Sequence, residues 1–260
     1  MGTMGRFAAD RSVGGGLAPS PLRATSSAVE RIPFRAGSEF RSLSPAASQA
    51  LSAAAGVKLY GPNEFIYLQD DPAAHLYFVR SGHVRLSYLL EDGTAVLFAI
   101  LPPGESFGEL GVFSASTHHD MATTVGNASV FRVSAGDVKA QEARGELPLA
   151  LGRTVARRYR AYIALTRSLG LKTLNGRLSQ ALLRVADDLG STATHLGRDV
   201  QSVGAFVTQS DLGLMARGAR SNVNRALKAW EKAGWIAMSD RSILILNRRR
   251  LESLWLEEGL

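Results

Sequence analysis

Cysteine is absent from the 260-residue sequence. Without a thiolate, the chain can form no disulfide, no thiolate zinc site, no iron–sulfur cluster and no cysteine nucleophile. Long apolar runs are absent too: no stretch reaches the roughly 18 residues that suggest a membrane-spanning helix, and no hydrophobic signal core follows the first charges. We therefore expect a cytoplasmic protein without a membrane segment. Its hydrophobic content of 45% is ordinary for a globular protein.

Acidic residues are scarce in the last part of the chain. Residues 151–260 carry 18 basic and 9 acidic side chains, whereas residues 42–150 carry 6 basic and 11 acidic ones. The first 41 residues add a surplus of +3, and the formal charge of the whole chain is +7. Because the positive charge is concentrated at one end, that end is a candidate for neutralising phosphates. A merely solvated basic surface is the alternative, and charge alone does not decide between them.

Periodicity is missing from residues 1–40, which combine glycine, proline and serine and predict a flexible tail. Residues 41–146 form the next unit. A short helix is expected after Ser44 and Pro45, since serine caps a helix and proline suits its first turn. Short apolar segments then alternate with turn residues up to Val133, and Asp92-Gly93 gives the best hairpin signal. This spacing predicts an antiparallel sandwich or barrel.

Residues 147–171 predict one long amphipathic helix, because apolar residues recur every three to four positions after Pro148. The apolar stripe is too long for a short loop to cover, so we expect a second copy of the helix as its partner and therefore a homodimer. Burial of this helix inside a monomer is the alternative. The residues predicted to form the dimer contact are Leu151, Val155, Tyr159, Tyr162, Leu165 and Leu169.

Residues 172–260 read as a helical unit that ends in a hairpin. An amphipathic helix is expected over 175–189, followed by a polar stretch over 191–204. Thr208 can cap a short helix, and a second helix is expected from about Ala219 to Gly234. Two short helices joined by a glycine-containing turn make a helix-turn-helix candidate. Two strands around Ser239-Asp240-Arg241 would add the hairpin of a winged variant.

Two stretches carry a resemblance to a known family. The stretch from Pro103 to Phe113, PGESFGELGVF, resembles the phosphate-binding cassette of the CRP/FNR superfamily, the cyclic-AMP receptor protein type of bacterial transcription regulator. The stretch from Thr208 to Arg225, with its hairpin, resembles the DNA-binding unit of the same family. The similarity runs from about Leu51 to Asn247, and the order of the parts also matches.

The resemblance implies an α+β fold. Its parts are an N-terminal double-stranded β-helix (jelly-roll) sensor domain, a long dimerisation helix and a C-terminal winged helix-turn-helix. It also implies a homodimeric transcription regulator, activator or repressor, that binds a palindromic operator in double-stranded DNA and contacts RNA polymerase. Occupancy of the sensor pocket would change the pairing of the long helices and so the spacing of the two recognition helices, which must lie about 34 Å apart.

The resemblance also implies a ligand pocket in the sensor domain. Gly108 would let the backbone approach a ligand, and Glu109 could accept a hydrogen bond from a ribose hydroxyl. The position that matches the family's phosphate-binding arginine falls on Asp120, and a carboxylate would repel a phosphate. We therefore predict that cyclic AMP does not bind in the usual way. The candidate pocket residues are Phe107, Gly108, Glu109, Leu110, His119, Asp120, Met121 and Tyr162.

The effector stays open at this point. A different ligand, no small ligand, and a cyclic nucleotide or cyclic di-GMP are the alternatives. A metal at His118 and His119 is not expected, because neighbours in sequence seldom point the same way and no third ligand is evident. A haem at His75 or His83 is the alternative that the family's carbon monoxide sensor suggests. No nucleophile–base pair or phosphate loop with lysine appears, so we expect no enzyme; a cyclic-nucleotide-controlled enzyme module is the alternative.

The second helix of the helix-turn-helix carries the candidate base contacts. The family's Arg-Glu-x-x-x-Arg pattern matches Arg220, Ser221 and Arg225, and each arginine can donate two hydrogen bonds to guanine. Ser221 replaces a carboxylate that would accept from cytosine, so the operator should differ from the usual half-site at that base. Asn222 and Asn224 could contact adenine or phosphate. At the start of the first helix, the expected phosphate contacts are Thr208, Gln209 and Ser210.

Overall fold

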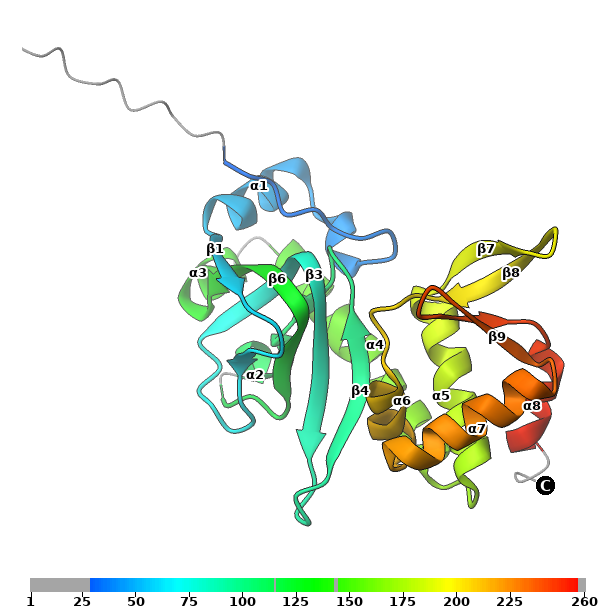
Figure 1. The fold of residues 1–260 in the computed structure, drawn as a ribbon. Coiled ribbons are helices and arrows are strands. Elements are labelled where there is room, and N and C mark those ends of the chain that lie inside the picture. The colour runs from blue at the N-terminus through cyan, green and yellow to red at the C-terminus, as the bar shows by residue number, and fades with distance from the viewer. Residues whose placement is uncertain (1–28, 115, 143–144, 257–260) are drawn as a thin grey trace, which may run out of the picture.

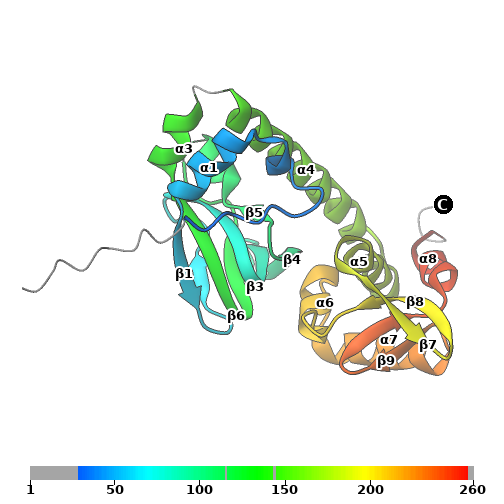
Figure 2. The ribbon, with the colours of Figure 1, turned by 90° about the horizontal axis from the view of Figure 1, so that it is seen from above.

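The computed structural model describes residues 29–114, 116–142 and 145–256. Most of the predicted tail, residues 1–28, lies outside the described part. Two bodies joined by one long helix make up the molecule (Figures 1 and 2). None of the helices in the described ranges is long and apolar enough to cross a membrane.

The N-terminal body is a rolled antiparallel sheet flanked by short helices. A 3-10 helix, η1 (Glu39–Ser42), and α1 (Pro45–Ala53) precede the sheet, and the Ser44 hydroxyl caps α1 as predicted. The main strand order is β1-β6-β3-β4, with β2 paired to β6 and β5 to β3. The strands are β1 (Gly56–Tyr60), β2 (Phe65–Tyr67), β3 (His75–Leu89), β4 (Ala95–Leu101), β5 (Ser106–Phe107) and β6 (Met121–Ser134); the helices between and after them are α2 (Glu109–Ser114) and α3 (Ala135–Glu142).

Register shifts let the two longest strands curl. Strand β3 pairs with β6 along most of its length, with irregularities between Val79 and His83. Bulges of this kind increase the local twist, which helps a sheet to roll. The predicted hairpin at Asp92-Gly93 joins β3 to β4, and Gly93 has a φ of 78°, a conformation that glycine adopts without strain.

The long helix α4 (Glu146–Leu169) has one face packed against its own sensor sheet. Leu151 is 0% exposed in a cluster with Phe78, and Leu165 is 1% exposed in a cluster with Phe98. The prediction that these two leucines form the dimer contact is therefore wrong, because the protomer's own sheet covers them. Val155, Tyr162 and Leu169 are half-buried, whereas Tyr159 is 65% exposed. The three-to-four spacing of apolar residues predicts that this face of the helix is covered. It does not predict whether the protomer's own sheet or a second helix covers it.

The C-terminal body combines a helix-turn-helix with a four-stranded sheet of order β7-β8-β10-β9. The polar stretch 191–204, for which no strand was predicted, forms the hairpin of β7 and β8. Only the last two residues of β8 are buried, so the hairpin shows no alternating hydrophobicity. The elements are α5 (Leu174–Leu189), β7 (Ser191–His195), β8 (Arg198–Val203), α6 (Gln209–Ala216), α7 (Arg220–Lys232), β9 (Ile236–Ser239), β10 (Ser242–Ile245) and α8 (Arg248–Leu256).

The two bodies are in direct contact through α6 and β4 (Figure 2). Leu97 and Ile100 of β4 belong to the same buried cluster as Leu212 and Met215 of α6. Beside this contact, Arg85 of β3 forms two hydrogen bonds to the Asp211 carboxylate, at 2.6 Å from Nε and 3.2 Å from Nη2. The contact fixes the helix-turn-helix against the sensor sheet in this conformation.

The packing of α4 on the sheet can be tested by truncating Leu151. Replacing this fully buried side chain by alanine removes apolar contacts and leaves a cavity, so Leu151→Ala should lower the free energy of unfolding by about 2–5 kcal/mol. Leu59→Ala is the control, because Leu59 is exposed, and it should change stability by less than about 0.5 kcal/mol. Urea unfolding at fixed protein concentration measures both. Equal effects would contradict the assigned face.

Candidate ligand pocket and DNA-reading face

The first helix of the helix-turn-helix is capped by its own sequence. The Thr208 hydroxyl accepts a hydrogen bond from the Asp211 amide at 3.1 Å, and the Asp211 carboxylate accepts one from the Thr208 amide at 2.8 Å. This reciprocal pair is a capping box, which satisfies two amides that a helix start leaves free. Within α6, a Cβ on Gly213 would lie 2.6 Å from the carbonyl oxygen of Gly218 in the turn, so a side chain there would push the turn away from the helix.

The second helix, α7, buries one side and exposes the other. Val223, Leu227 and Trp230 face the core. Arg220 and Arg225 are exposed and make no hydrogen bond or ion pair with any residue that the structure describes. Free guanidinium groups at the start of an exposed helix can donate to base edges or phosphates.

Most of the other predicted DNA contacts are also accessible. Thr208, Ser210, Ser221 and Asn222 are exposed. Gln209 and Asn224 are half-buried and bonded to each other, with Asn224 Nδ2 donating to Gln209 Oε1 at 3.0 Å. The fold therefore joins the starts of α6 and α7 into one polar surface.

In the cassette, Gly108 is required by neighbouring side chains. Its φ is +76°, and a Cβ there would lie 2.9 Å from Tyr77 Cδ2 and 3.2 Å from His118 Cε1. Sequence reasoning expected a ligand at this close approach, but the groups that crowd Gly108 belong to the protein. Phe107 beside it is fully buried.

Glu109 is held by an arginine that sequence reasoning did not place in the site. It is buried, and Arg158 Nε of α4 donates to its Oε1 at 3.2 Å. Arg158 Nη2 also donates to the Ser106 carbonyl at 2.8 Å. The sequence shows Arg158 within a run of arginines, which normally indicates a solvated face, so only the fold reveals that it is buried.

Asp120 occupies a closed, aromatic environment. The Tyr67 hydroxyl donates to its Oδ1 at 3.0 Å, and the His118 ring stacks on Tyr67 with centroids 3.6 Å apart. Burial, helped by the nearby charge of Glu109, raises the pKa of Asp120 to about 7. Burial also lowers the pKa of His118 to about 4, so this histidine is neutral at physiological pH. No positive charge is available in this group for a phosphate.

The predicted pocket residues divide into two sets. Leu110, His119 and Tyr162 come together on an open groove of about 340 Å³, which Gln69, Tyr88 and Leu89 complete. Phe107, Gly108, Glu109 and Asp120 lie in the buried layer of the sensor domain, and Met121 is half-buried at the start of β6. The two adjacent histidines differ in the same way, since His118 is buried and His119 lines the groove. His83 stacks on Phe206 of the C-terminal body.

Each of the two bodies matches a known protein family. The family model described as cyclic nucleotide-binding domain matches residues 57–143, and the Crp-like helix-turn-helix domain matches residues 176–254. The CRP-like cAMP-activated global transcriptional regulator of Mycobacterium tuberculosis is 27% identical over 224 residues, which cover 86% of this chain and 98% of that protein.

Two further relatives match about three quarters of the chain. The transcriptional regulator LdrP of Thermus thermophilus is 26% identical over 204 residues, or 75% of this chain and 95% of its own. The solved structure of FixK2 from Bradyrhizobium japonicum is 28% identical, has a TM-score of 0.66, and the match covers 77% of this chain and 96% of that one.

The raised pKa of Asp120 predicts a stabilising substitution. In the unfolded chain an aspartate has a pKa near 3.9. Ionising Asp120 in the folded protein therefore lowers the free energy of unfolding. This loss of stability is absent below about pH 4 and complete above about pH 7. Asp120→Asn removes this cost while leaving an acceptor for Tyr67. Thermal and urea unfolding should show the variant more stable by roughly 2–4 kcal/mol at pH 8 and by little at pH 4.

A second substitution controls for a general charge effect. Asp70→Asn removes a carboxylate from the same domain, and that position is exposed. The stability of Asp70→Asn relative to the wild type should not rise comparably between pH 4 and pH 8. A gain for Asp120→Asn that does not change with pH would contradict the assigned ionisation.

Proposed function

Because the chain belongs to the CRP/FNR superfamily of transcription regulators, we propose that it works as a homodimer that binds a palindromic DNA operator through two copies of α7. The observation that carries this proposal is the exposed start of α7, where Arg220 and Arg225 have no partner among the described residues. Ser221 lies between them, in place of the family's glutamate, and gives the half-site a different base preference. The cap of α6 adds phosphate contacts that position the helix.

The dimer contact is assigned to the face of α4 that the sensor sheet leaves open. Residues on this face follow an alternating three- and four-residue spacing, which is the pattern of paired helices. Its small members allow close approach and its large members supply apolar area. The residues are Leu149, Gly152, Ala156, Tyr159, Ile163 and Thr166, all exposed or half-buried.

A twofold axis along α4 would place both helix-turn-helix units at the same end of the dimer. Such symmetry matches a palindromic site, whose half-sites lie one helical turn apart. A regulator bound to chromosomal DNA acts in the cytoplasm beside RNA polymerase, without turning over a substrate. Activation or repression then depends on where the operator lies relative to the promoter.

The effector is proposed to be a ligand other than cyclic AMP in its usual binding mode. The open groove at Leu110, His119 and Tyr162 has room for a small ligand, yet the nearest buried charges are the carboxyl groups of Asp120 and Glu109. Arg158 is already bonded to Glu109 and is not free to take a phosphate. A bound ligand changes DNA affinity only if it binds the two states of the dimer differently.

Fluorescence anisotropy tests the proposed function. The purified protein is titrated onto palindromic duplexes selected from random DNA, at fixed salt because phosphate contacts make affinity salt-dependent. Cyclic AMP, cyclic GMP and cyclic di-GMP are added in turn. Tight sequence-specific binding is expected, with less than a tenfold effect of cyclic AMP. Failure to select any specific duplex would contradict the proposal.

Single substitutions on α7 separate base contacts from general charge. Arg220→Gln and Arg225→Gln should each weaken operator binding by about 1–3 kcal/mol, and most at the guanine that each arginine reads. Lys232→Gln removes the same charge at the other end of the helix and should reduce specific affinity much less. The measurement is anisotropy with the operator and with single-base variants. A uniform loss on every sequence would indicate phosphate contact instead.

The assigned dimer face predicts a change in mass. Ile163→Glu places a charge within the apolar contact, and burying an unpaired charge there is strongly unfavourable. Sedimentation velocity should show a dimer for the wild type and a monomer for Ile163→Glu at micromolar concentration. Leu59→Glu, at an exposed apolar position on β1, is the control and should stay dimeric. A dimeric Ile163→Glu protein would show that the contact lies elsewhere.

A further inference from the structure

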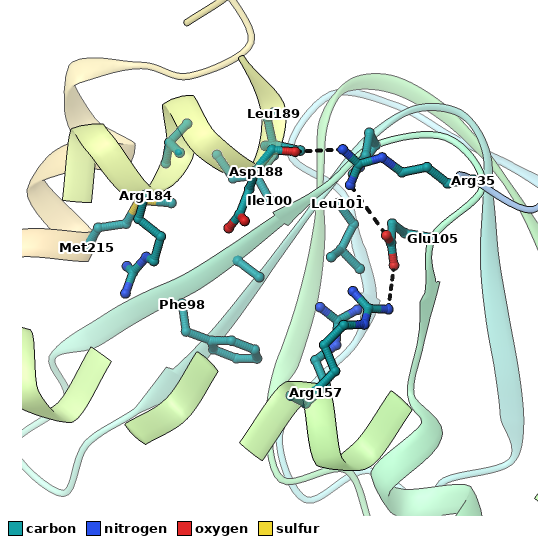
Figure 3. A pocket seen from close by; sticks show the side chains of 14 residues that line it. Arg35, Phe98, Ile100, Leu101, Glu105, Arg157, Arg184, Asp188, Leu189 and Met215 are labelled. Atoms are coloured by element: carbon teal, nitrogen blue, oxygen red, sulfur yellow. Dashed lines mark hydrogen bonds and ion pairs between the residues drawn. The ribbon is translucent and has the colours of Figure 1, made fainter. Parts of the chain in front are cut away.

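A small cavity lies where the two bodies and the N-terminal segment meet (Figure 3). It has a volume of about 70 Å³. Strand β4 forms one wall, through Phe98 and Ile100, and α4, α5 and Met215 of α6 form the others. The cavity is therefore part of the junction that fixes the DNA-binding domain against the sensor domain, and it is separate from the groove at Tyr162.

The charged groups around this cavity contain more hydrogen-bond donors than acceptors. Four guanidinium groups line it, from Arg35, Arg157, Arg158 and Arg184, against the carboxylates of Glu105 and Asp188. Each guanidinium carries five N–H donors and no acceptor. The lining has a net positive charge even with both carboxylates ionised.

Of the two carboxylates, Glu105 is the one whose oxygens are already used in hydrogen bonds. The two oxygens of Glu105 accept from Arg35 at 3.4 Å and from Arg157 at 2.9 Å. Arg35 also donates to the Asp188 carbonyl at 2.6 Å, which ties the N-terminal segment to the end of α5. Arg158 is committed to Glu109 and the Ser106 carbonyl.

Arg184 is left without a partner. It makes no hydrogen bond and no ion pair with any residue that the structure describes, and its Nη2 atom is buried. The Nε atom of Arg157, across the cavity on α4, is also buried and unbonded. Burial of this guanidinium lowers the pKa of Arg184, and the nearby charge of Asp188 offsets the effect only in part. An acceptor with negative charge would satisfy both arginines.

We propose that this cavity binds a free tetrahedral oxyanion, inorganic phosphate or sulfate, between Arg157 of α4 and Arg184 of α5. One water needs about 10–15 Å³ of this kind of space, so the cavity holds about five waters or one such ion and excludes a nucleotide. Guanidinium groups bind phosphate through paired charge-assisted hydrogen bonds.

Asp188 is the group that opposes the ion. Figure 3 shows its side chain extending into the space between Arg184 and Arg157. Asp188 is an exposed residue at the end of α5, so it can turn outward to water when the ion enters. Although the residue as a whole is exposed, its carboxyl group faces the cavity, and partial loss of water there raises its pKa, which weakens it as a counter-ion for Arg184.

The ion would act on the joint between the two bodies. Arg157 and Arg184 lie on either side of the turn that connects α4 to α5, and an ion bonded to both resists a change in the angle between these helices. Bound oxyanion therefore stabilises the docked position of the DNA-binding domain. This regulatory consequence rests on the proposed function, whereas the binding itself does not.

Isothermal titration calorimetry on the full-length protein tests the binding. Inorganic phosphate is titrated at constant ionic strength, with sodium chloride replaced as phosphate is added. Saturable binding of one ion per protomer is expected for the wild type, and Arg184→Gln should lose at least tenfold in affinity. Arg41→Gln, which removes the same group from an exposed site away from the cavity, should bind as the wild type does.

A third variant distinguishes loss of the phosphate site from a general folding defect. Asp188→Asn removes the opposing carboxylate and should bind phosphate severalfold more tightly, a gain that a damaged fold cannot produce. Glycerol 3-phosphate should bind at least tenfold more weakly than phosphate, because the cavity has no room for the glycerol. Undiminished phosphate binding by Arg184→Gln, or a response that does not saturate in the wild type, overturns the proposal.

The regulatory consequence is measured separately by operator anisotropy. Phosphate should change the affinity of the wild type at least threefold relative to chloride at the same ionic strength, and should not change that of Arg184→Gln. Calorimetry needs no DNA, so its failure and the failure to find an operator are distinguishable. Equal effects of phosphate on the wild type and on Arg184→Gln would show that this ion site does not regulate the joint between α4 and α5.

Discussion

Burial of one face of α4 against its own sensor sheet determines where the other working surfaces lie. Leu151 and Leu165 fix the helix to the sheet, and Arg158 joins it to the cassette through Glu109. The opposite face is left exposed, where the proposed dimer contact lies, and the end of α4 sets where α5 begins. A change in the sensor domain can reach the DNA-binding domain by this helix or by the contact of α6 with β4.

The sensor domain has the fold of a cyclic nucleotide-binding domain but a different set of charges. Tyr67, His118 and Asp120 form a packed neutral or acidic group where a phosphate would need a cation. The proposed phosphate site lies instead at the junction of the two bodies, where Arg184 has a buried Nη2 atom without a hydrogen bond to any described residue. The two sites would respond to different chemistry, one to a small ligand beside Tyr162 and the other to an inorganic ion.

Local signals in the sequence predicted much of this fold. The Ser44 cap, the Asp92-Gly93 hairpin and the Thr208 cap depend on neighbours in sequence, and each formed as expected. Features that depend on distant residues could not be predicted in this way. The β7–β8 hairpin has no alternating hydrophobicity, and the burial of Arg158 depends on a glutamate 49 residues away.

The same limit explains the error in the dimer face. Periodicity located an apolar stripe on α4, but the helix has two such stripes, and only the sheet shows which one is covered. In the pocket, the departure at Asp120 was visible from the sequence, whereas its bond to Tyr67 and the closure of the space around it were not. The exposure of Arg220 and Arg225 could be predicted from the sequence, because it follows from the position of both residues on one amphipathic helix.

In the proposed dimer, two copies of α7 meet DNA at a fixed spacing set by the paired α4 helices. The absence of cysteine allows one spin label per protomer, introduced at Ala229→Cys on the exposed side of α7 away from the predicted base contacts. Double electron–electron resonance on the operator complex measures the distance between the two labels. One narrow distribution near the roughly 34 Å repeat of DNA is expected. A complex that gives no label-to-label distance, or one as broad as the protein without DNA, would contradict this arrangement.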